Sequence, residues 1–344
     1  MQTAPALRCN AHQNARARGP PRSLRRRQHG HQAMHPEAAR DTSPPPTMPF
    51  GQVVVGPPGS GKSTYCAALA RHLASSGRSV AVVNLDPAND ALVYEAALDV
   101  SELVGLEAVQ EETGLGPNGG LIWAMEYLET NIDWLLDRLR PLTQGEEGCM
   151  DSYGPPPQCT SLEGSRGCAG AVPLECSRTR FACVWGHLTV ELFQLHAGFK
   201  RILGTLERQL SMRLVAVQLI DAHLCADAGK YMAALLLALS TMLHLELPQV
   251  NAFSKYDLLD RHGDLAMSQE FYLEAHGLEH LVESMSVGFP PAFQDLSRGL
   301  CEVVEDFGLL SFLPLEVESA ESMKRLVAVA DKANGYYHIP PTMA

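Results

Sequence analysis

Runs of consecutive apolar residues alternate along much of the chain with segments whose apolar residues recur every three or four positions. The runs predict buried strands, and the spaced segments predict helices that cover them. The predicted strands are Gln52–Val55, Ser79–Leu85, Leu214–Ile220, Gln249–Phe253 and Leu313–Val317. The predicted helices are Lys62–Ser76, Leu121–Leu139, Lys230–His244 and Ser319–Asn334. Apolar strands with helices between them indicate an α/β fold with a mostly parallel sheet and helices on both faces.

Two parts of the chain lack this pattern. Residues 1–47 have almost no apolar periodicity, so we expect a disordered basic extension. A transit peptide or a short basic import signal is the alternative. Residues 143–188 hold seven Gly, four Pro and five of the nine Cys, and we expect a low-order insertion or replacement there.

The rest of the chain is expected to form one domain. Its two parts are residues 48–142 and 189–337, which together have about 250 residues, an ordinary size for a single α/β domain. Residues 338–344 form a tail.

Charge and composition narrow the function classes. The first 48 residues carry +6 and the whole chain −12, so the remainder carries −18. An acidic domain argues against direct nucleic-acid binding. The longest apolar stretch, Met232–Leu243, is too short to span a bilayer, so no membrane association is expected. The cysteines form neither a disulfide framework nor close pairs, which favours a reducing, cytoplasmic location.

The segment GPPGSGKST, between the first predicted strand and helix, fits the phosphate-binding pattern G-x-x-x-x-G-K-[ST]. Its glycines let backbone N–H groups face phosphates, and the helix N-terminus adds partial positive charge. Lys62 would contact the β- and γ-phosphates, and the Ser63 hydroxyl would bind Mg²⁺. A Gly-rich turn is the structural alternative. The predicted nucleotide-binding residues here are Gly56, Pro57, Pro58, Gly59, Ser60, Gly61, Lys62, Ser63 and Thr64.

Two further segments follow strands and carry candidate chemistry. Asp86, in NLDPAND, lies at the carboxyl end of a predicted strand, where a carboxylate could orient or deprotonate water; a simple Asp-Pro turn is the alternative. FSKYDL resembles the [N/T]-K-x-D element of GTPases. By that resemblance Ser254 takes its first position, Lys255 lies along a guanine ring, and Asp257 accepts hydrogen bonds from the base. A polar loop after a strand is the alternative.

The segment GLGPNGGLIW places a proline between two glycines before a predicted helix. GPPGSGKST, VNLDPAN, GPNGGL, FSKYDL and DKANGYY occur in that order, and with them the chain resembles the GPN-loop GTPases, most of all their second paralogue. The resemblance covers about residues 51–142 and 190–337. It implies a P-loop NTPase fold of the dimerising, signal-recognition and MinD-like class, with GTP or GDP and Mg²⁺ as ligands.

The same resemblance implies partners and a role for the loop. Gly116, Pro117 and Asn118 would reach the nucleotide site of a second protomer, with the Asn118 amide near the γ-phosphate. The partner would be a second copy or a GPN-loop paralogue. The family is implicated in assembly and nuclear import of RNA polymerases, so polymerase subunits or their assembly factors are the expected partners, with shuttling to the nucleus.

One departure from the family bears on catalysis. Family members carry Asp-x-Pro-Gly-Gln before a Val-Glu-Leu that matches Val190–Leu192, but here the preceding residues read VWGHLT. The carboxylate of the Mg²⁺ shell, the γ-phosphate glycine and the catalytic glutamine are missing. We expect the strand that delivers them to be missing too, and hydrolysis to be impaired. Asp221, which ends a later strand, is expected to cap a helix.

Three functions therefore stay open. The first is a GTPase switch and assembly factor, with Asp86, Asn118 and Lys62 as the catalytic candidates. The second is a nucleotide-binding scaffold that does not hydrolyse GTP. The third is a P-loop kinase, which would need an Arg-bearing lid over the phosphates.

Overall fold

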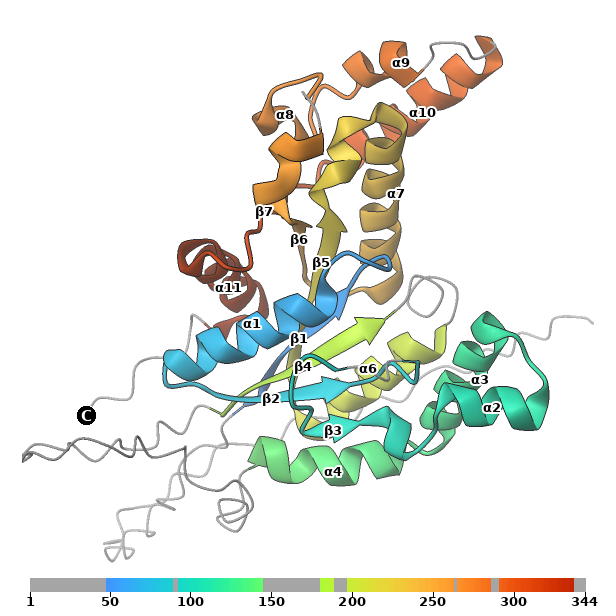
Figure 1. The fold of residues 1–344 in the computed structure, drawn as a ribbon, viewed down its shortest axis with the longest axis vertical. Helices are drawn as coiled ribbons and strands as arrows, with labels where there is room; N and C mark the ends of the chain where they lie inside the picture. The colour runs from blue at the N-terminus through green and yellow to red at the C-terminus, as the bar shows by residue number, and fades with distance from the viewer. Residues whose placement is uncertain are drawn as a thin grey trace, which may run out of the picture. The chain divides into compact units, whose positions relative to one another are not determined.

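The structure is a computed structural model that describes residues 48–88, 92–144, 180–188, 197–262, 265–285 and 291–336, all within one compact unit, Pro46–Ala344. Within these ranges one parallel sheet runs in the order β3-β2-β4-β1-β5-β6-β7 (Figure 1). The strands are β1 Phe50–Val55, β2 Ser79–Asn84, β3 Leu98–Asp99, β4 Arg180–Leu188, β5 Arg213–Asp221, β6 Gln249–Ser254 and β7 Phe312–Pro314. The predicted parallel α/β sheet is confirmed.

Helices and short 3₁₀ segments connect the strands. The helices are α1 Lys62–Ser75, α2 Leu106–Thr113, α3 Pro117–Thr130, α4 Ile132–Gln144, α6 Ala197–Leu210, α7 Ala228–Leu245, α8 Gln269–Glu274, α9 Glu279–Met285, α10 Pro291–Phe307 and α11 Ala320–Asn334. The 3₁₀ segments are η1 Val100–Glu102, η3 Ala222–Ala226 and η4 Tyr256–His262.

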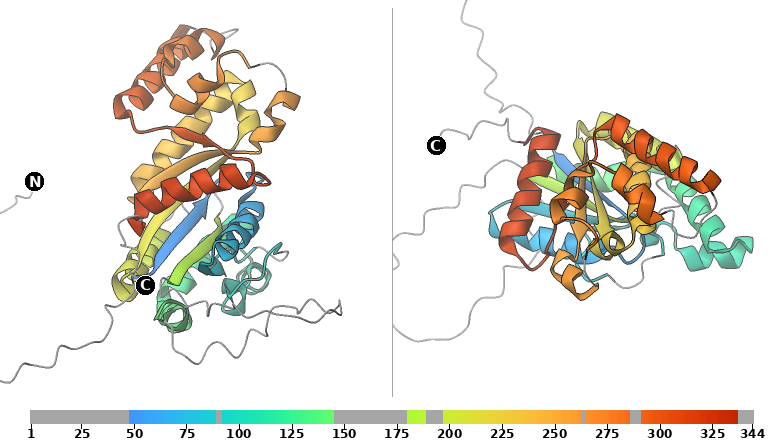
Figure 2. Two further views of the ribbon diagram at one scale, coloured as in Figure 1. Left: turned by 90° about the vertical axis from the view of Figure 1, so that its left-hand side faces the viewer. Right: turned by 90° about the horizontal axis from the view of Figure 1, so that it is seen from above.

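Helices cover the sheet on both faces (Figure 2). Successive residues of a strand point to opposite faces. Val53 and Val55 of β1 accordingly join a core with α3, α4 and α6, whereas Val54 joins a core with α1 and α11. All six residues of β1 are buried, as expected for a central strand of a parallel sheet.

Helix α7 covers β5 and β6 and belongs to a third apolar core with α8, α9 and α10. It is 18 residues long and apolar enough to span a membrane by length and composition alone. One such helix is weak evidence, because core helices pass the same test. The side chains of Tyr231, Leu235 and Ala238 are fully buried against the rest of this core, as expected for a core helix.

The structure corrects the expectation for the end of segment 143–188. Arg180–Leu188 form β4, which pairs in parallel with both β1 and β2 and so lies near the centre of the sheet. The predicted absence of a strand here is therefore wrong. The sequence FACVW within it is apolar enough for a buried strand, but the glycines, prolines and cysteines upstream concealed it. Residues 145–179, like 1–47, lie outside the described residues.

The single helix predicted over Leu121–Leu139 is two helices, α3 and α4. The Asn131 side-chain amide donates to the backbone oxygen of Tyr127 at 2.8 Å. Asn131 caps α3 at this point, since such a side chain competes with the helical backbone hydrogen bonds. The pattern failed to show the break because apolar spacing continues on both sides of Asn131.

The described part of the DKANGYY segment, Asp331–Tyr336, contacts residues at the start of β1 and just before β2. Asp331 of α11 accepts from Arg78 at 2.6 Å, and both side chains are 13% exposed. The Arg78 guanidinium lies 4.0 Å from the Tyr336 ring centre, and that ring packs edge-on against Phe50 of β1. Gly335 ends α11 with φ 84°, a conformation that favours glycine. These contacts fasten α11 to the edge of the sheet where β1 begins.

We predict that Arg78→Met destabilises the fold by about 3 kcal/mol. The change keeps a long aliphatic side chain but leaves the buried Asp331 carboxylate without its cationic partner. Arg325→Met is the matched control: its ion pair with Glu321 lies on the same helix but is exposed, and its loss should cost less than about 0.5 kcal/mol. Urea unfolding measures both. Equal losses would show that the Arg78–Asp331 pair contributes no more than a surface pair.

Candidate functional site

The sheet collects the predicted site residues at one edge. In a parallel sheet all carboxyl ends lie at the same edge, so the segments after β1, β2, β5 and β6 converge there. The P-loop, Gly56–Thr64, follows β1, Asp86 follows β2, and Ser254–Asp257 ends and follows β6. Since β6 is two strands from β1, the P-loop and the segment at β6 lie about 10 Å apart across the sheet.

The P-loop glycines are placed by two different constraints. Gly56 packs against β5: a Cβ there would lie 2.3 Å from the backbone oxygen of Leu219. Gly59 and Gly61 instead have open space but φ values of 77° and 83°, which favour glycine. Gly61 is the N-cap of α1, so the loop leads directly into the positive end of that helix.

Lys62 is buried in this loop, with 2% of its surface exposed. Its Nζ donates to the backbone oxygens of Gly56 and Pro57, both at 2.9 Å. Burial lowers the pKa of Lys62 to about 8, although the nearby Asp86 carboxylate raises it. The ammonium is thus held by two neutral carbonyls, which compensate less for lost hydration than a phosphate would.

Asp86 is fixed by its neighbours on β2 and β3. Its backbone N–H donates to the Asn84 side-chain oxygen at 3.2 Å, and its own Oδ1 accepts from the backbone N–H of Ala88 at 2.9 Å. The Asn84 amide in turn donates to Asp99 at 3.1 Å. Asp86 is buried, so its carboxylate is held at the phosphate end of the edge rather than in solvent.

The segment after β6 makes a sharp turn. Ser254 is buried and donates from its hydroxyl to Ile220 O at 3.2 Å. Lys255 has φ 56°, unusual for a residue with a side chain, and its Nζ pairs with Asp221 at 2.6 Å. Asp257, in the first turn of η4, is exposed to solvent, where a ligand can reach it.

The glycine- and proline-rich loop has a local reason for most of its special residues. Gly114 ends α2 with φ 68°, and Pro117 occupies the first turn of α3, where its missing N–H costs nothing. A Cβ at Gly120 would lie 2.7 Å from Leu106, so glycine allows α2 and α3 to approach closely. Asn118 is exposed. Among the described residues, no hydrogen bond or ion pair joins it to the P-loop of its own chain.

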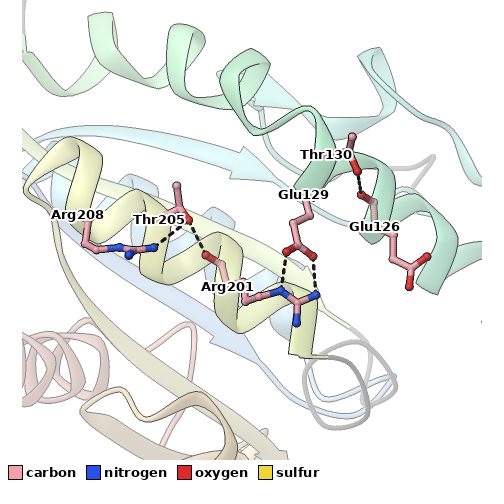
Figure 3. Close-up of polar contacts among 6 residues, drawn as sticks. All are labelled: Glu126, Glu129, Thr130, Arg201, Thr205 and Arg208. Atoms are coloured by element: carbon pink, nitrogen blue, oxygen red, sulfur yellow. Dashed lines mark hydrogen bonds and ion pairs between the residues drawn. The ribbon is translucent and has the colours of Figure 1, made fainter.

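Helix α3, which begins with this loop, is joined to α6 by a bidentate ion pair. Arg201 donates from Nε and a terminal nitrogen to the two oxygens of Glu129, at 2.5 and 2.8 Å (Figure 3). Paired contacts of this kind fix direction as well as distance. The contact lies near the C-terminal end of α3, so it helps to set where the opposite end presents Asn118.

A protein-family model described as "Conserved hypothetical ATP binding protein" matches residues 54–147 and 189–336. GPN-loop GTPase QQT1 of Arabidopsis thaliana is 44% identical over 84% of this chain and 86% of its own length. GPN-loop GTPase 2 of Danio rerio is 43% identical over 86% and 84% of the two chains.

The chain belongs to the GPN-loop GTPase family.

A solved structure supports the fold. The apo form of a GTPase from Pyrococcus abyssi superposes with a TM-score of 0.59 over 83% of this chain and 97% of that one, at 21% identity. Family membership makes this protein a GTP-binding P-loop protein of the GTP-hydrolase class. The family model does not match residues 148–188, so β4 of this GPN-loop GTPase is formed by sequence outside the matched parts.

Two side chains at this edge make contacts that the sequence did not predict. Asp221 was expected only to cap a helix; it does cap η3, accepting from the backbone N–H of His223, but it also binds Lys255. Asn84 was not singled out, although it links Asp86 to β3. Their polar character after or within an apolar strand was the available signal, and their partners are distant in sequence or on another strand.

We predict that Gly56→Ala destabilises the protein by about 2 kcal/mol or more and abolishes GTP binding, because the methyl group would overlap a backbone oxygen of β5. Gly59→Ala is the control: it meets no atom and pays only for its backbone conformation, about 1 kcal/mol. Urea unfolding and calorimetric titration with GTP test both. Equal effects would mean that close packing on β5 is not the constraint.

We also predict that GTP binding takes up a proton at high pH. The empty protein loses the Lys62 proton near pH 8, whereas bound phosphates keep the lysine charged. Affinity should therefore fall as pH rises above about 8, approaching tenfold per pH unit. Calorimetry in two buffers of different ionisation enthalpy, at about pH 7 and about pH 9, measures the uptake. The same uptake at both values would contradict the lowered lysine pKa.

Proposed function

We propose that the protein is a Mg²⁺-dependent guanine-nucleotide switch that binds phosphates at the P-loop and the base at Ser254, Lys255 and Asp257. The observation that carries this proposal is the buried Lys62, whose ammonium is held by P-loop carbonyls at the sheet edge that also bears the lysine–aspartate turn. The family model's description names ATP and the relatives are named as GTPases, so the base preference needs a direct test.

At the phosphate end, the roles follow from position. Lys62 would exchange its two carbonyl partners for the β- and γ-phosphates, a charge-assisted contact that is stronger in a buried site. The glycines of the loop allow its backbone N–H groups to turn toward the phosphates. Asp86 is held beside Lys62, where it would orient an attacking water.

The same residues suit Mg²⁺. Ser63, in the first turn of α1, offers a hydroxyl, and the buried Asp86 offers a carboxylate. Mg²⁺ prefers oxygen ligands and is usually held by one or two protein groups together with substrate phosphates. The described residues contain no cluster of three acidic, His or Cys side chains that could hold a metal ion. When bound, the metal would neutralise charge on the phosphates.

At the base end, Asp257 supplies specificity. A carboxylate can accept two hydrogen bonds from the paired N–H groups of guanine, a pattern that adenine does not present at that edge. Asp257 is exposed at the start of η4, and Lys255 lies two residues before it at the turn out of β6. The aliphatic stem of Lys255 would lie along the ring.

We expect GTP to bind much more tightly than ATP, and Asp257→Asn to shift the preference toward xanthosine triphosphate, because the change exchanges an acceptor for a donor at the base edge. Competition against a labelled guanine nucleotide measures both. Lys62→Ala is the control, since it should abolish binding of every triphosphate. Competition by ATP at parity with GTP in the parent would contradict the base assignment.

The Gly-Pro-Asn loop is proposed to act between protomers. The exposure of Asn118 and the bidentate ion pair between α3 and α6 support a role on a second protomer, either another copy or a GPN-loop paralogue. Asn118 would place its amide near the γ-phosphate there. Because Pro117 restricts its own backbone and already lies in the first turn of α3, docking would order little additional chain.

The biological setting is proposed from family resemblance. The protein would act as an assembly factor whose partners are RNA polymerase subunits or their own assembly factors. It would work in the cytoplasm with shuttling to the nucleus, without binding nucleic acid or membranes directly. The acidic charge of the chain beyond its first 48 residues is consistent with protein partners rather than nucleic acid.

Hydrolysis is proposed to be impaired in this chain. The strand β4 is present, but the sequence at its end lacks the Asp-x-Pro-Gly-Gln residues of the family. Lys62, Ser63 and Asp86 remain for binding and partial positioning. A nucleotide-binding scaffold is therefore the second candidate function. The kinase alternative would need an Arg-bearing lid over the phosphates. The Arg-bearing segment that could supply it, residues 166–180, lies outside the described residues except for Arg180, and the relatives are named as GTPases.

We predict that this chain cleaves GTP at least about a hundredfold more slowly than a variant in which residues 185–189 become Asp-x-Pro-Gly-Gln. The reason is that positioned donors supply most of the acceleration in phosphoryl transfer. The graft replaces Trp185–Leu188 at the carboxyl end of β4 and keeps Arg180–Val184, which also pair with β1 and β2. Single-turnover cleavage by protein in excess over GTP measures the rates, with Asp86→Asn in the graft as a control that should lose the gain. Equal rates in graft and parent would refute impaired hydrolysis.

A further inference from the structure

The base segment is attached to a neighbouring strand through one carboxylate. β5 and β6 run in parallel with Asp221 opposite Ser254, so Lys255 is the first residue beyond the end of the pair. The Asp221 side chain is 15% exposed and that of Lys255 is 42% exposed. Asp221 is therefore the more buried partner of this ion pair and Lys255 the more exposed one, although 34 residues separate them along the chain.

Both oxygens of Asp221 have assigned partners. Oδ2 accepts from Lys255 Nζ at 2.6 Å. Oδ1 accepts from the backbone N–H of His223 at 3.1 Å and lies 2.9 Å from Nδ1 of the same residue. Burial alone would raise the pKa of Asp221, yet its pKa is lowered because Lys255 and His223 donate to the charged form. The carboxylate is thus charged and fixed in orientation.

Lys255 needs such support because of its backbone. With φ 56° it adopts the left-handed conformation, which is unfavourable for a residue with a Cβ. Its backbone oxygen accepts from Leu258 at 3.0 Å, and the next residue, Tyr256, donates to Leu315 O at 3.2 Å. The peptide bond that follows Lys255 is therefore held through both its oxygen and its N–H, while the ion pair to Asp221 holds the side chain.

We propose that Asp221 is a positioning residue of the guanine site, which holds the Lys255 side chain in place before the nucleotide arrives. The proposal rests on the proposed function, in which the Lys255 stem lies along the base. A lysine that is already ordered loses less freedom when a ligand binds. His223 acts one step further away, by fixing the carboxylate of Asp221 so that Oδ2 faces Lys255.

Asp221→Asn is the decisive variant because it removes the charge and keeps the cap. Asparagine caps helices as well as aspartate does, so the bond to the backbone of His223 is retained. We expect the GTP dissociation constant, measured by calorimetry, to rise about threefold to tenfold. Asp227→Asn is the matched control: Asp227 caps α7 by the same kind of bond, 2.9 Å to the backbone N–H of Lys230, and should leave the constant unchanged.

A double-mutant cycle separates positioning from structure. In a Lys255→Met background, Asp221→Asn should have no further effect on GTP affinity, because its target is gone. Equal losses in both backgrounds would assign Asp221 a structural role and overturn the proposal. His223→Ala keeps the charge of Asp221 and should give a smaller loss in the same direction, which tests the arrangement even if Asp221→Asn unfolds.

Measurements on the unmutated protein distinguish failure of the positioning role of Asp221 from failure of the base assignment. If it binds GTP in preference to ATP and Asp221→Asn matches it in GTP affinity, only the positioning role fails. If the parent does not distinguish GTP from ATP, the base assignment fails, and the positioning proposal falls with it.

Discussion

The position of β1 at the centre of the parallel sheet is the constraint on which the other features depend. It is buried on both faces and hydrogen-bonded to β4 on one side and β5 on the other. Its carboxyl end therefore cannot reach solvent except along the sheet edge, where Gly56 turns the chain directly against Leu219 of β5. This packing sets the position of the P-loop. The order of the remaining strands sets which other segments lie beside it at the same edge.

Two lysines at this edge are held in place in the structure by different partners. Lys62 is bound by the carbonyls of Gly56 and Pro57, which are neutral, and burial lowers its pKa. Lys255 is bound by the charged Asp221, which is itself fixed by His223. A carbonyl is a weaker partner for an ammonium than a phosphate is, whereas a carboxylate matches its charge. In the proposed function, Lys62 would therefore change partners when a nucleotide binds, whereas Lys255 would keep its partner.

Strand β4 is present in the sheet although the Asp-x-Pro-Gly-Gln sequence of the family is absent at its end. The strand completes the sheet between β2 and β1, so the arrangement of the P-loop and Asp86 does not need the family sequence at its end. Any sequence apolar enough to be buried can fill a central strand, because backbone hydrogen bonds and burial are satisfied alike. By resemblance to the family, positioning water and the γ-phosphate is proposed to require Asp-x-Pro-Gly-Gln, which does not precede Val190 in this sequence. In the proposed function, binding and hydrolysis can therefore be lost separately.

The sequence by itself determined the alternation of strands and helices, the P-loop and the lysine–aspartate segment, because these depend on residues that are close along the chain. GPPGSGKST needs only a preceding strand and a following helix, and both were visible from apolar spacing. The break at Asn131 was hidden because a side-chain hydrogen bond, rather than apolar spacing, produces it. Strand β4 was hidden because the glycines, prolines and cysteines upstream of its apolar residues indicated a low-order segment. Only the tertiary structure decided which distant charges meet: Asp331 with Arg78, and Asp221 with Lys255. An ion pair has no sequence period, so packing of the sheet had to bring these side chains together before their chemistry could be assigned.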